Sequence, residues 1–195
     1  MKKARLEAFS DGVLAIIITI MVLEIKVPHG RDFAALQPLI PVFVSYVLSF
    51  IYLGIYWNNH HHMMHTVSSI NGSILWANLH LLFWLSLIPF VTGWVGENPV
   101  GPIPVAIYGF ILLMAGAAYW ILQQIIIKKQ GEHSLLAKAI GNDLKGKISP
   151  ILYLTAILST YYHPIIAEIL YVLVALIWLI PDKRIERIFN EEGKH

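Results

Sequence analysis

The 195-residue sequence contains no cysteine and few charged residues. The missing thiols exclude disulfide bonds, thiolate metal sites and cysteine nucleophiles. Charged residues make up 13% of the chain and apolar residues 57%, whereas soluble globular domains carry about 25% and about 45–50%. The composition therefore excludes an ordinary soluble domain and indicates a chain that lies mostly in a lipid bilayer.

Apolar segments of membrane-spanning length follow one another along the chain. A helix needs about 20 such residues to cross the bilayer core, so the sequence has room for six crossings. We expect these spans at residues 4–27, 33–57, 74–95, 104–127, 148–162 and 164–180. A short amphipathic piece at 134–140 is expected to lie at the membrane surface. The sequence predicts an all-α integral membrane protein with six transmembrane helices in one domain, residues 1–195.

The basic residues predict how these spans are oriented. Twelve of the 14 lysines and arginines lie at the N-terminus, between the fourth and fifth spans, or after the sixth; Lys26 and Arg31 do not. With six spans, all three basic segments fall on one side, and segments rich in lysine and arginine stay in the cytoplasm. We therefore expect a multi-pass protein of the cell membrane with both termini in the cytoplasm.

Polar residues interrupt the first apolar span near its N-terminal end. Arg5, Ser10 and Asp11 lie there, and Thr19 lies in the most hydrophobic half of the span. Charged groups at a lipid-spanning position are costly unless they are paired or face water, so these residues are candidates for function. A signal anchor whose polar end stays at the membrane surface is the simpler alternative.

This first span resembles the first-helix signature of the transmembrane protein 175 family. The resemblance lies in the pattern Arg5-x-x-x-Phe9-Ser10-Asp11-Gly12, followed by Ala15-Ile16 and Thr19. The family contains the endolysosomal potassium channels and their bacterial and archaeal homologues. In the rest of the chain the similarity is mainly one of hydropathy, length and layout. The resemblance implies a potassium-selective cation channel, which is not an enzyme and needs no cofactor besides the potassium ion that it conducts.

A helical projection of the first span shows one stripe of branched aliphatic residues. The stripe runs through Ile16 and contains Gly12, Thr19, Ile20 and Leu23, each of which lies within about 60° of Ile16 at 100° per residue. The polar residues Ser10 and Asp11 lie on other faces. The stripe fits a pore lining, a core face or a lipid-facing surface, and periodicity alone does not choose among them.

The resemblance implies that the first helices line the pore. It places Ile16 at the main hydrophobic constriction, Leu23 at a second apolar ring and Thr19 at a pore-facing hydroxyl, with Ile20 beside them. One chain supplies one pore helix, so the expected assembly is a homotetramer. The chain has no Thr-Val-Gly-Tyr-Gly loop that could form a carbonyl filter. Aliphatic rings would instead narrow the pore and gate it partly by dewetting, with potassium bound near Thr19.

The polar residues of the first helix are expected to hold helices together rather than to bind ions. The family uses an arginine–histidine–aspartate network at this membrane depth. The expected network contains Arg5, Phe9, Ser10, Asp11, Trp57, His60, His61 and His80. Which histidines take part stays open, and Asn58 and Asn78 are further available partners.

Two other functions fit parts of the sequence. A secondary cation or proton transporter is one, although such proteins commonly show inverted repeats, broken helices and midplane charges that are not evident here. A metal site at residues 60–65 is the other, because His61 and His65 have the i, i+4 spacing that lets two histidines bind one ion. No carboxylate lies near them in the sequence, so an interfacial polar network is favoured and no metal is expected.

Overall fold

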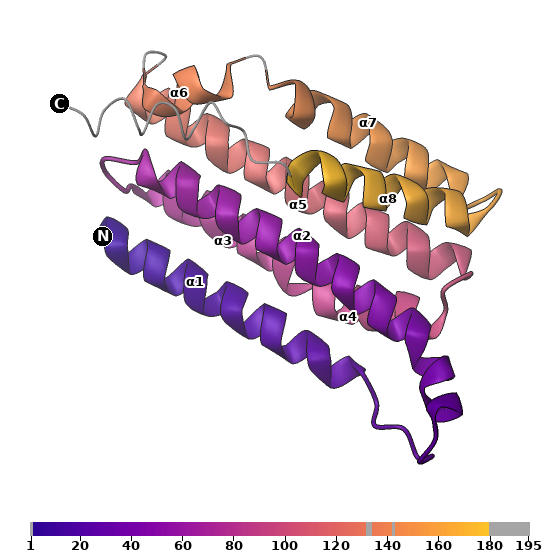
Figure 1. Ribbon diagram of the computed structural model, residues 1–195. Helices are drawn as coiled ribbons and strands as arrows, with labels where there is room; N and C mark the ends of the chain where they lie inside the picture. The colour runs from indigo at the N-terminus through magenta and orange to yellow at the C-terminus, as the bar shows by residue number, and fades with distance from the viewer. Residues whose placement is uncertain (1, 132–133, 142, 180–195) are drawn as a thin grey trace.

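The computed structural model describes residues 2–131, 134–141 and 143–179, and its secondary structure is helical (Figure 1). The elements, in chain order, are α1 (Lys3–Ile20), η1 (Met21–Glu24), η2 (Phe33–Leu39), α2 (Ile40–His65), α3 (Gly72–Ser86), α4 (Ile88–Glu97), α5 (Pro102–Gln130), α6 (Leu135–Ile140), α7 (Leu144–Ser159) and α8 (Pro164–Leu179). The predicted all-α class is confirmed.

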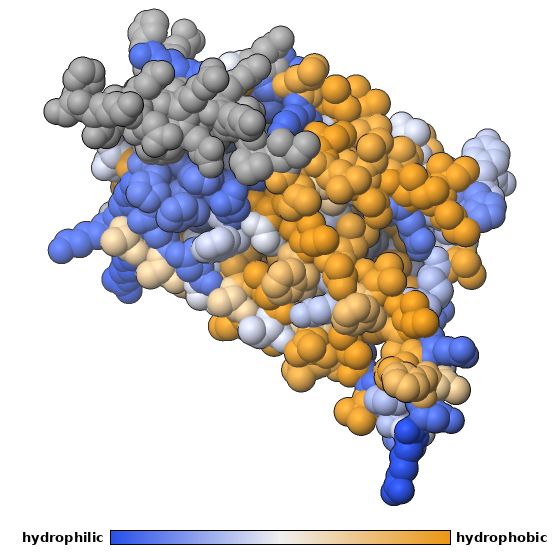
Figure 2. All heavy atoms as spheres, viewed as in Figure 1, coloured by the Kyte–Doolittle hydropathy of each residue, from blue (hydrophilic) through white to orange (hydrophobic). Residues whose placement is uncertain are grey.

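The long helices lie side by side in one bundle, with α1 at one edge and α7 at the opposite edge (Figure 1). The start of α1, the turn between α2 and α3, and the segment from α5 through α6 to α7 gather at one end of this bundle. On the face seen in Figure 2, apolar residues form a broad central region with hydrophilic residues toward its two ends. Such an apolar band is what a bilayer core requires of the surface that it contacts.

Among the described residues, four helical stretches are long and apolar enough to cross a membrane: Lys3–Glu24, Phe33–His65, Gly72–Glu97 and Pro102–Gln130. Helix α8 is apolar but shorter, and α7 has 16 residues. These elements follow the expected spans in order, and α6 occupies the expected amphipathic piece. The end of the last expected span, at residue 180, and the basic tail after it lie outside the described residues.

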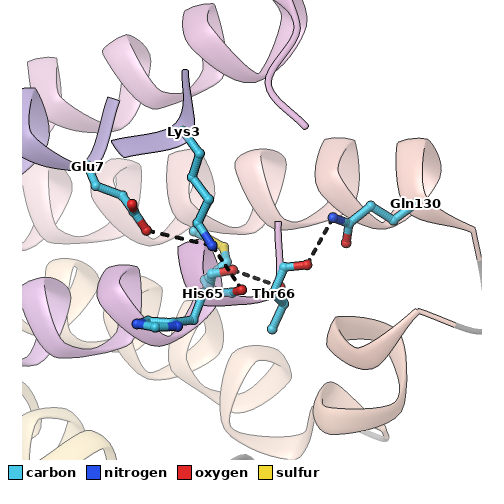
Figure 3. Close-up of polar contacts among 6 residues, drawn as sticks. Lys3, Glu7, His65, Thr66 and Gln130 are labelled. Atoms are coloured by element: carbon cyan, nitrogen blue, oxygen red, sulfur yellow. Dashed lines mark hydrogen bonds and ion pairs between the residues drawn. The ribbon is translucent and has the colours of Figure 1, made fainter. Parts of the chain in front are cut away.

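Helix α2 continues beyond the second expected span, through the histidine-rich segment to His65. Side chains from two other helices bond the carbonyl oxygens at its end (Figure 3). The Lys3 ammonium group donates to the His65 carbonyl oxygen at 3.0 Å, and the Gln130 amide donates to the Thr66 carbonyl oxygen at 3.0 Å. These bonds satisfy carbonyl groups that have no partner within a helix end.

The third predicted span, expected as one helix, is two helices that meet at Leu87. Pro89 explains the break, because it has no backbone N–H to donate to the carbonyl of Leu85 and its ring crowds that turn. At the other end of α3, the Asn71 side chain accepts a hydrogen bond from the Ile74 N–H at 3.0 Å and caps the helix.

Helices α5 and α8 approach closely at Gly109, where a Cβ atom would overlap the Tyr171 hydroxyl group. That hydroxyl donates to the Val105 carbonyl oxygen at 3.0 Å, and the Tyr171 carbonyl oxygen accepts from the Tyr52 hydroxyl at 2.6 Å. Tyr171 is therefore bonded to α5 and to α2 in the buried centre of the bundle.

Replacing Gly109 with alanine is expected to lower the stability of the fold by about 1–3 kcal/mol, the usual cost of overpacking a buried contact. Thermal unfolding in detergent measures this loss. Gly116→Ala on the same helix is the control, because the nearest atom to its added Cβ is the Tyr56 hydroxyl oxygen at an ordinary 3.7 Å. Equal stability of the two variants would show that the α5–α8 contact tolerates a methyl group.

Candidate ion pathway on the first helix

Helix α1 has one packed face and one open face within the protomer. Its packed face lies against α2, α3 and α4. The buried residues of this face, continued into η1, are Leu6, Ser10, Leu14, Ile17 and Met21. The opposite face is covered by no other described part of the chain.

The open face carries every residue that the sequence places in the aliphatic stripe. Ile16 is 61% exposed and Leu23 is 77% exposed, and Gly12, Thr19 and Ile20 are exposed as well. Large aliphatic side chains left open along one helix face mark a surface that meets lipid, another chain or a pore. The protomer thus brings the predicted constriction residues onto one continuous surface.

Leu23 lies at a different angle from the one that an α-helical projection predicts. The α-helix ends at Ile20, and Met21–Glu24 form a tighter 3₁₀ turn. At about 120° per residue in this turn, Leu23 follows the direction of Ile20 and is rotated by about 60° from its expected position. Leu23 therefore extends the Ile20 side of the stripe.

The Thr19 hydroxyl group bonds back to its own helix. It lies 2.9 Å from the Ala15 carbonyl oxygen and 3.0 Å from the Ile16 carbonyl oxygen. This bond uses the hydroxyl hydrogen, whereas the oxygen lone pairs, which a cation would contact, stay available. The back-bond and an ion-coordinating role are therefore compatible.

A buried chain of hydrogen bonds connects α1, α2 and α3. The Asn78 amide nitrogen donates to the Ser10 hydroxyl oxygen at 2.9 Å, and the Asn78 carbonyl oxygen lies 2.7 Å from His60 Nε2. Ser10 in turn donates to the Leu6 carbonyl oxygen at 2.9 Å. Ser10, His60 and Asn78 are all buried, so the three helices share one closed polar contact. In membrane bundles such contacts contribute to helix association.

Asp11 takes part in a separate contact at the edge of the open face. The Trp57 indole N–H donates to the Asp11 carboxylate at 3.1 Å. The His61 ring stacks on Trp57 with 6.3 Å between ring centroids, and it meets the His65 ring at 4.8 Å. Trp57 is 47% exposed, so this contact lies where a neighbouring subunit could reach it.

Three predicted network residues lie apart from both contacts. Arg5 is exposed, and its side chain forms no hydrogen bond or ion pair with another described residue. Phe9 is 50% exposed. His80 accepts a hydrogen bond from the Trp84 indole at 2.9 Å, one turn further along its own helix. Within the protomer, the single predicted network is therefore divided into separate groups.

Asn78, an available partner that the expected network omitted, is the central member of the buried group that joins Ser10 and His60. The sequence feature that could have identified Asn78 is its polar side chain in an otherwise apolar span. A second buried polar group was missed: Thr92 donates to Ser49 at 2.7 Å, and Ser49 lies 3.0 Å from the Tyr108 hydroxyl. Serine, threonine and tyrosine are common in membrane helices, so their positions alone do not reveal this contact.

The histidine-rich end of α2 is the segment that the sequence offers as a metal site. Among the described residues, no group of three or more histidine, aspartate or glutamate side chains is placed to hold a metal ion. His61 and His65 do lie close together, as their spacing predicts.

At the other end of the bundle, an ion pair joins the segment after α1 to α4. The Lys26 ammonium group pairs with the Glu97 carboxylate, and this hydrogen bond raises the pKa of Lys26. The Glu24 side chain lies against Gly93 of α4, where a Cβ atom would collide with it. Both contacts hold the end of the aliphatic stripe against α4.

The fold and this site define a helical membrane protein whose N-terminal helix is packed on one face and open along an aliphatic stripe on the other. A family profile described as endosomal/lysosomal potassium channel TMEM175 matches residues 5–89. A potassium channel of Chryseobacterium sp. (strain P1-3) is 59% identical over 191 residues, which cover 98% of this chain and 100% of that protein. The chain belongs to the TMEM175 family.

A solved structure and a vertebrate relative agree with this assignment. The crystal structure of a lysosomal potassium-selective channel TMEM175 homologue from Chamaesiphon minutus matches with a TM-score of 0.81 and 26% identity, covering 92% of this chain and 97% of that one. The human endosomal/lysosomal proton channel TMEM175 is 35% identical over 96 residues, 43% of this chain and 19% of that protein. The family and these relatives are ion channels, not enzymes.

Proposed function

We propose that this protein is a potassium channel in which four copies of the chain surround a central pore lined by α1. The observation that carries the proposal is the open face of α1 and η1, where Ile16, Thr19 and Leu23 lie exposed while the opposite face packs against the bundle. A single chain supplies one copy of α1, so a closed pore lined by this helix needs several copies. Potassium is the ion named for the bacterial relatives.

The proposed mechanism relies on aliphatic rings rather than on a carbonyl filter. Four copies of Ile16 would form the main constriction and four copies of Leu23 a second ring. A narrow apolar ring stays dry and blocks ions until it widens or wets. Between these rings, the Thr19 oxygens would replace part of the hydration shell of a potassium ion.

We propose six membrane crossings, with α3 and α4 forming the third and both termini in the cytoplasm of a cell-membrane protein. Helix α7 and the described part of α8 each have 16 residues and extend about 24 Å. For α7 this is a little short of the roughly 30 Å core, which a local thinning of the bilayer accommodates. The basic residues of the N-terminus and of the α5–α7 segment lie at the same end of the bundle. That arrangement supports a cytoplasmic placement of this end.

Potassium flux from liposomes containing the purified protein tests the function. We expect valinomycin-independent potassium efflux, unitary currents in planar bilayers and a detergent-corrected mass of four chains. A flux that saturates and is coupled to a second ion, without unitary currents, would contradict a channel and favour a transporter. A mass other than four chains would contradict the tetramer alone.

Replacing Thr19 with valine is expected to lower the preference for potassium over sodium severalfold while the channel still assembles. Valine keeps the shape of the side chain and removes the oxygen, so the change isolates coordination from size. Reversal potentials under bi-ionic conditions measure the preference. Thr19→Ser, which keeps the hydroxyl group, is the control and should stay close to the parent. Unchanged selectivity in the valine variant would assign selectivity to the aliphatic rings alone.

A further inference from the structure

A cavity of about 280 Å³ lies between α2, α5, α7 and α8. Its wall is rich in aromatic side chains: Tyr52, Tyr56, Tyr119, Trp120, Tyr153 and Trp178. Trp120 is 55% exposed and Pro150 is exposed too, so the cavity opens on the surface formed by α5 and α7. Helix α7 lies at the edge of the bundle opposite α1 (Figure 1), so this opening is remote from the proposed pore.

Two polar groups in the cavity wall have no partner among the described residues. The Gln123 side chain is 7% exposed and forms no hydrogen bond with another described residue. The Tyr56 side chain is 8% exposed, and its hydroxyl group forms no such hydrogen bond either. Among the described residues, every fully buried side-chain nitrogen or oxygen atom forms a hydrogen bond. The Gln123 amide and the Tyr56 hydroxyl group form none, so they are not fully buried, and the cavity accounts for their small exposure. Leaving an amide unbonded in an apolar wall is unfavourable, and a molecule in the cavity would remove that cost.

The charge of the wall restricts what this molecule can be. Asp143 lines the cavity, and its carboxylate accepts a hydrogen bond from the Gly146 N–H at 2.9 Å, which caps α7. A carboxylate or phosphate head in the cavity would be repelled by this charge. Apart from Asp143, the wall is mostly apolar with a few polar groups, as ligand sites generally are. It therefore suits a largely apolar molecule that carries a few hydrogen-bonding atoms.

We propose that this cavity binds the neutral head of a single-chain amphiphile from the bilayer, of the monoacylglycerol type. Its hydroxyl groups would bond Gln123 and Tyr56, and its alkyl chain would leave past Trp120 into the lipid. The lipid-facing position of α5 and α7 rests on the proposed channel function, in which α1 faces the axis.

Native mass spectrometry of the purified protein with 1-decanoylglycerol tests the site, and decanoate serves as the anionic probe with the same chain length. We expect the parent to retain 1-decanoylglycerol and to bind decanoate about tenfold more weakly or not at all. Gly116→Leu should abolish retention, because Gly116 lines the cavity and a Cβ atom there has room, with the Tyr56 hydroxyl oxygen at 3.7 Å as its neighbour. Gly54→Leu should leave retention unchanged, because Gly54 does not line the cavity and a Cβ atom there meets nothing within 4 Å.

The Gln123 amide has its own matched pair of variants. Gln123→Leu keeps the size of the side chain and should weaken the retention of 1-decanoylglycerol by up to about tenfold, which is the usual contribution of one hydrogen bond. Gln124→Leu changes the exposed neighbour on the same helix and should have no effect. Equal binding of both probes, full retention by Gly116→Leu, or no binding to the parent would overturn the proposal. Because the readout is a mass and not a current, this result is independent of the potassium flux assay.

Discussion

Replacing Ile16 with asparagine is expected to raise potassium conductance and to reduce the preference for potassium over sodium severalfold. Ile16 is the most central of the exposed aliphatic residues on α1, and four copies would form the narrowest ring of the proposed pore. An amide in place of an aliphatic side chain lets water enter the ring, so the dewetted barrier to ions is lost. Single-channel currents with potassium and sodium on opposite sides measure both effects.

The matched control is Ile16→Leu, which keeps the volume and the apolar character of the ring and should retain the selectivity of the parent. Because Ile16 is not packed inside the protomer, neither substitution should lower protomer stability by more than about 0.5 kcal/mol. If the asparagine variant conducts and selects like the parent, Ile16 does not face the pore. The open face would then be a surface for lipid or for a neighbouring subunit.

Replacing Asn78 with leucine is expected to destabilise the fold strongly. Leucine has nearly the same size, but it removes the bridge between Ser10 and His60. The buried His60 ring then loses its hydrogen bond, whereas Ser10 keeps its bond to the Leu6 carbonyl oxygen. An orphaned buried partner costs about 1–3 kcal/mol. The melting temperature in detergent measures the loss, and the ion selectivity of the surviving channels should not change.

Asn58→Leu is the control for this variant, because Asn58 is only partly buried and forms no side-chain hydrogen bond with another described residue. A double variant that combines Asn78→Leu with His60→Leu should be less destabilised than the sum of the single variants, since the pair is removed together. Fully additive losses would show that the bond between His60 and Asn78 does not stabilise the protein.

The positions of the polar residues of α1 were predictable from the sequence, but their partners on other helices were less so. Ser10 and Asp11 stand out because they interrupt an apolar span, and a projection places them off the aliphatic stripe. Their partners were only partly predictable: Asp11 does contact Trp57, whereas Ser10 contacts Asn78, which the expected network omitted. Neighbouring residues of a helix point about 100° apart. They therefore meet different helices, and only the packing of the bundle decides which ones.

The sequence by itself determined the membrane class, the order of the helices and the TMEM175 resemblance, because apolar length and a short motif are local properties of the chain. It also placed Ile16, Thr19 and Ile20 together, since residues three and four apart lie on the same side of one α-helix and need no other element. The tertiary structure decided the direction of Leu23, which lies in a 3₁₀ turn rather than in the α-helix. It also decided that His60 rather than His80 forms the buried hydrogen bond to Asn78. It alone revealed the cavity beside Gln123. These features depend on how helices distant in the sequence pack against one another, which a local pattern does not encode.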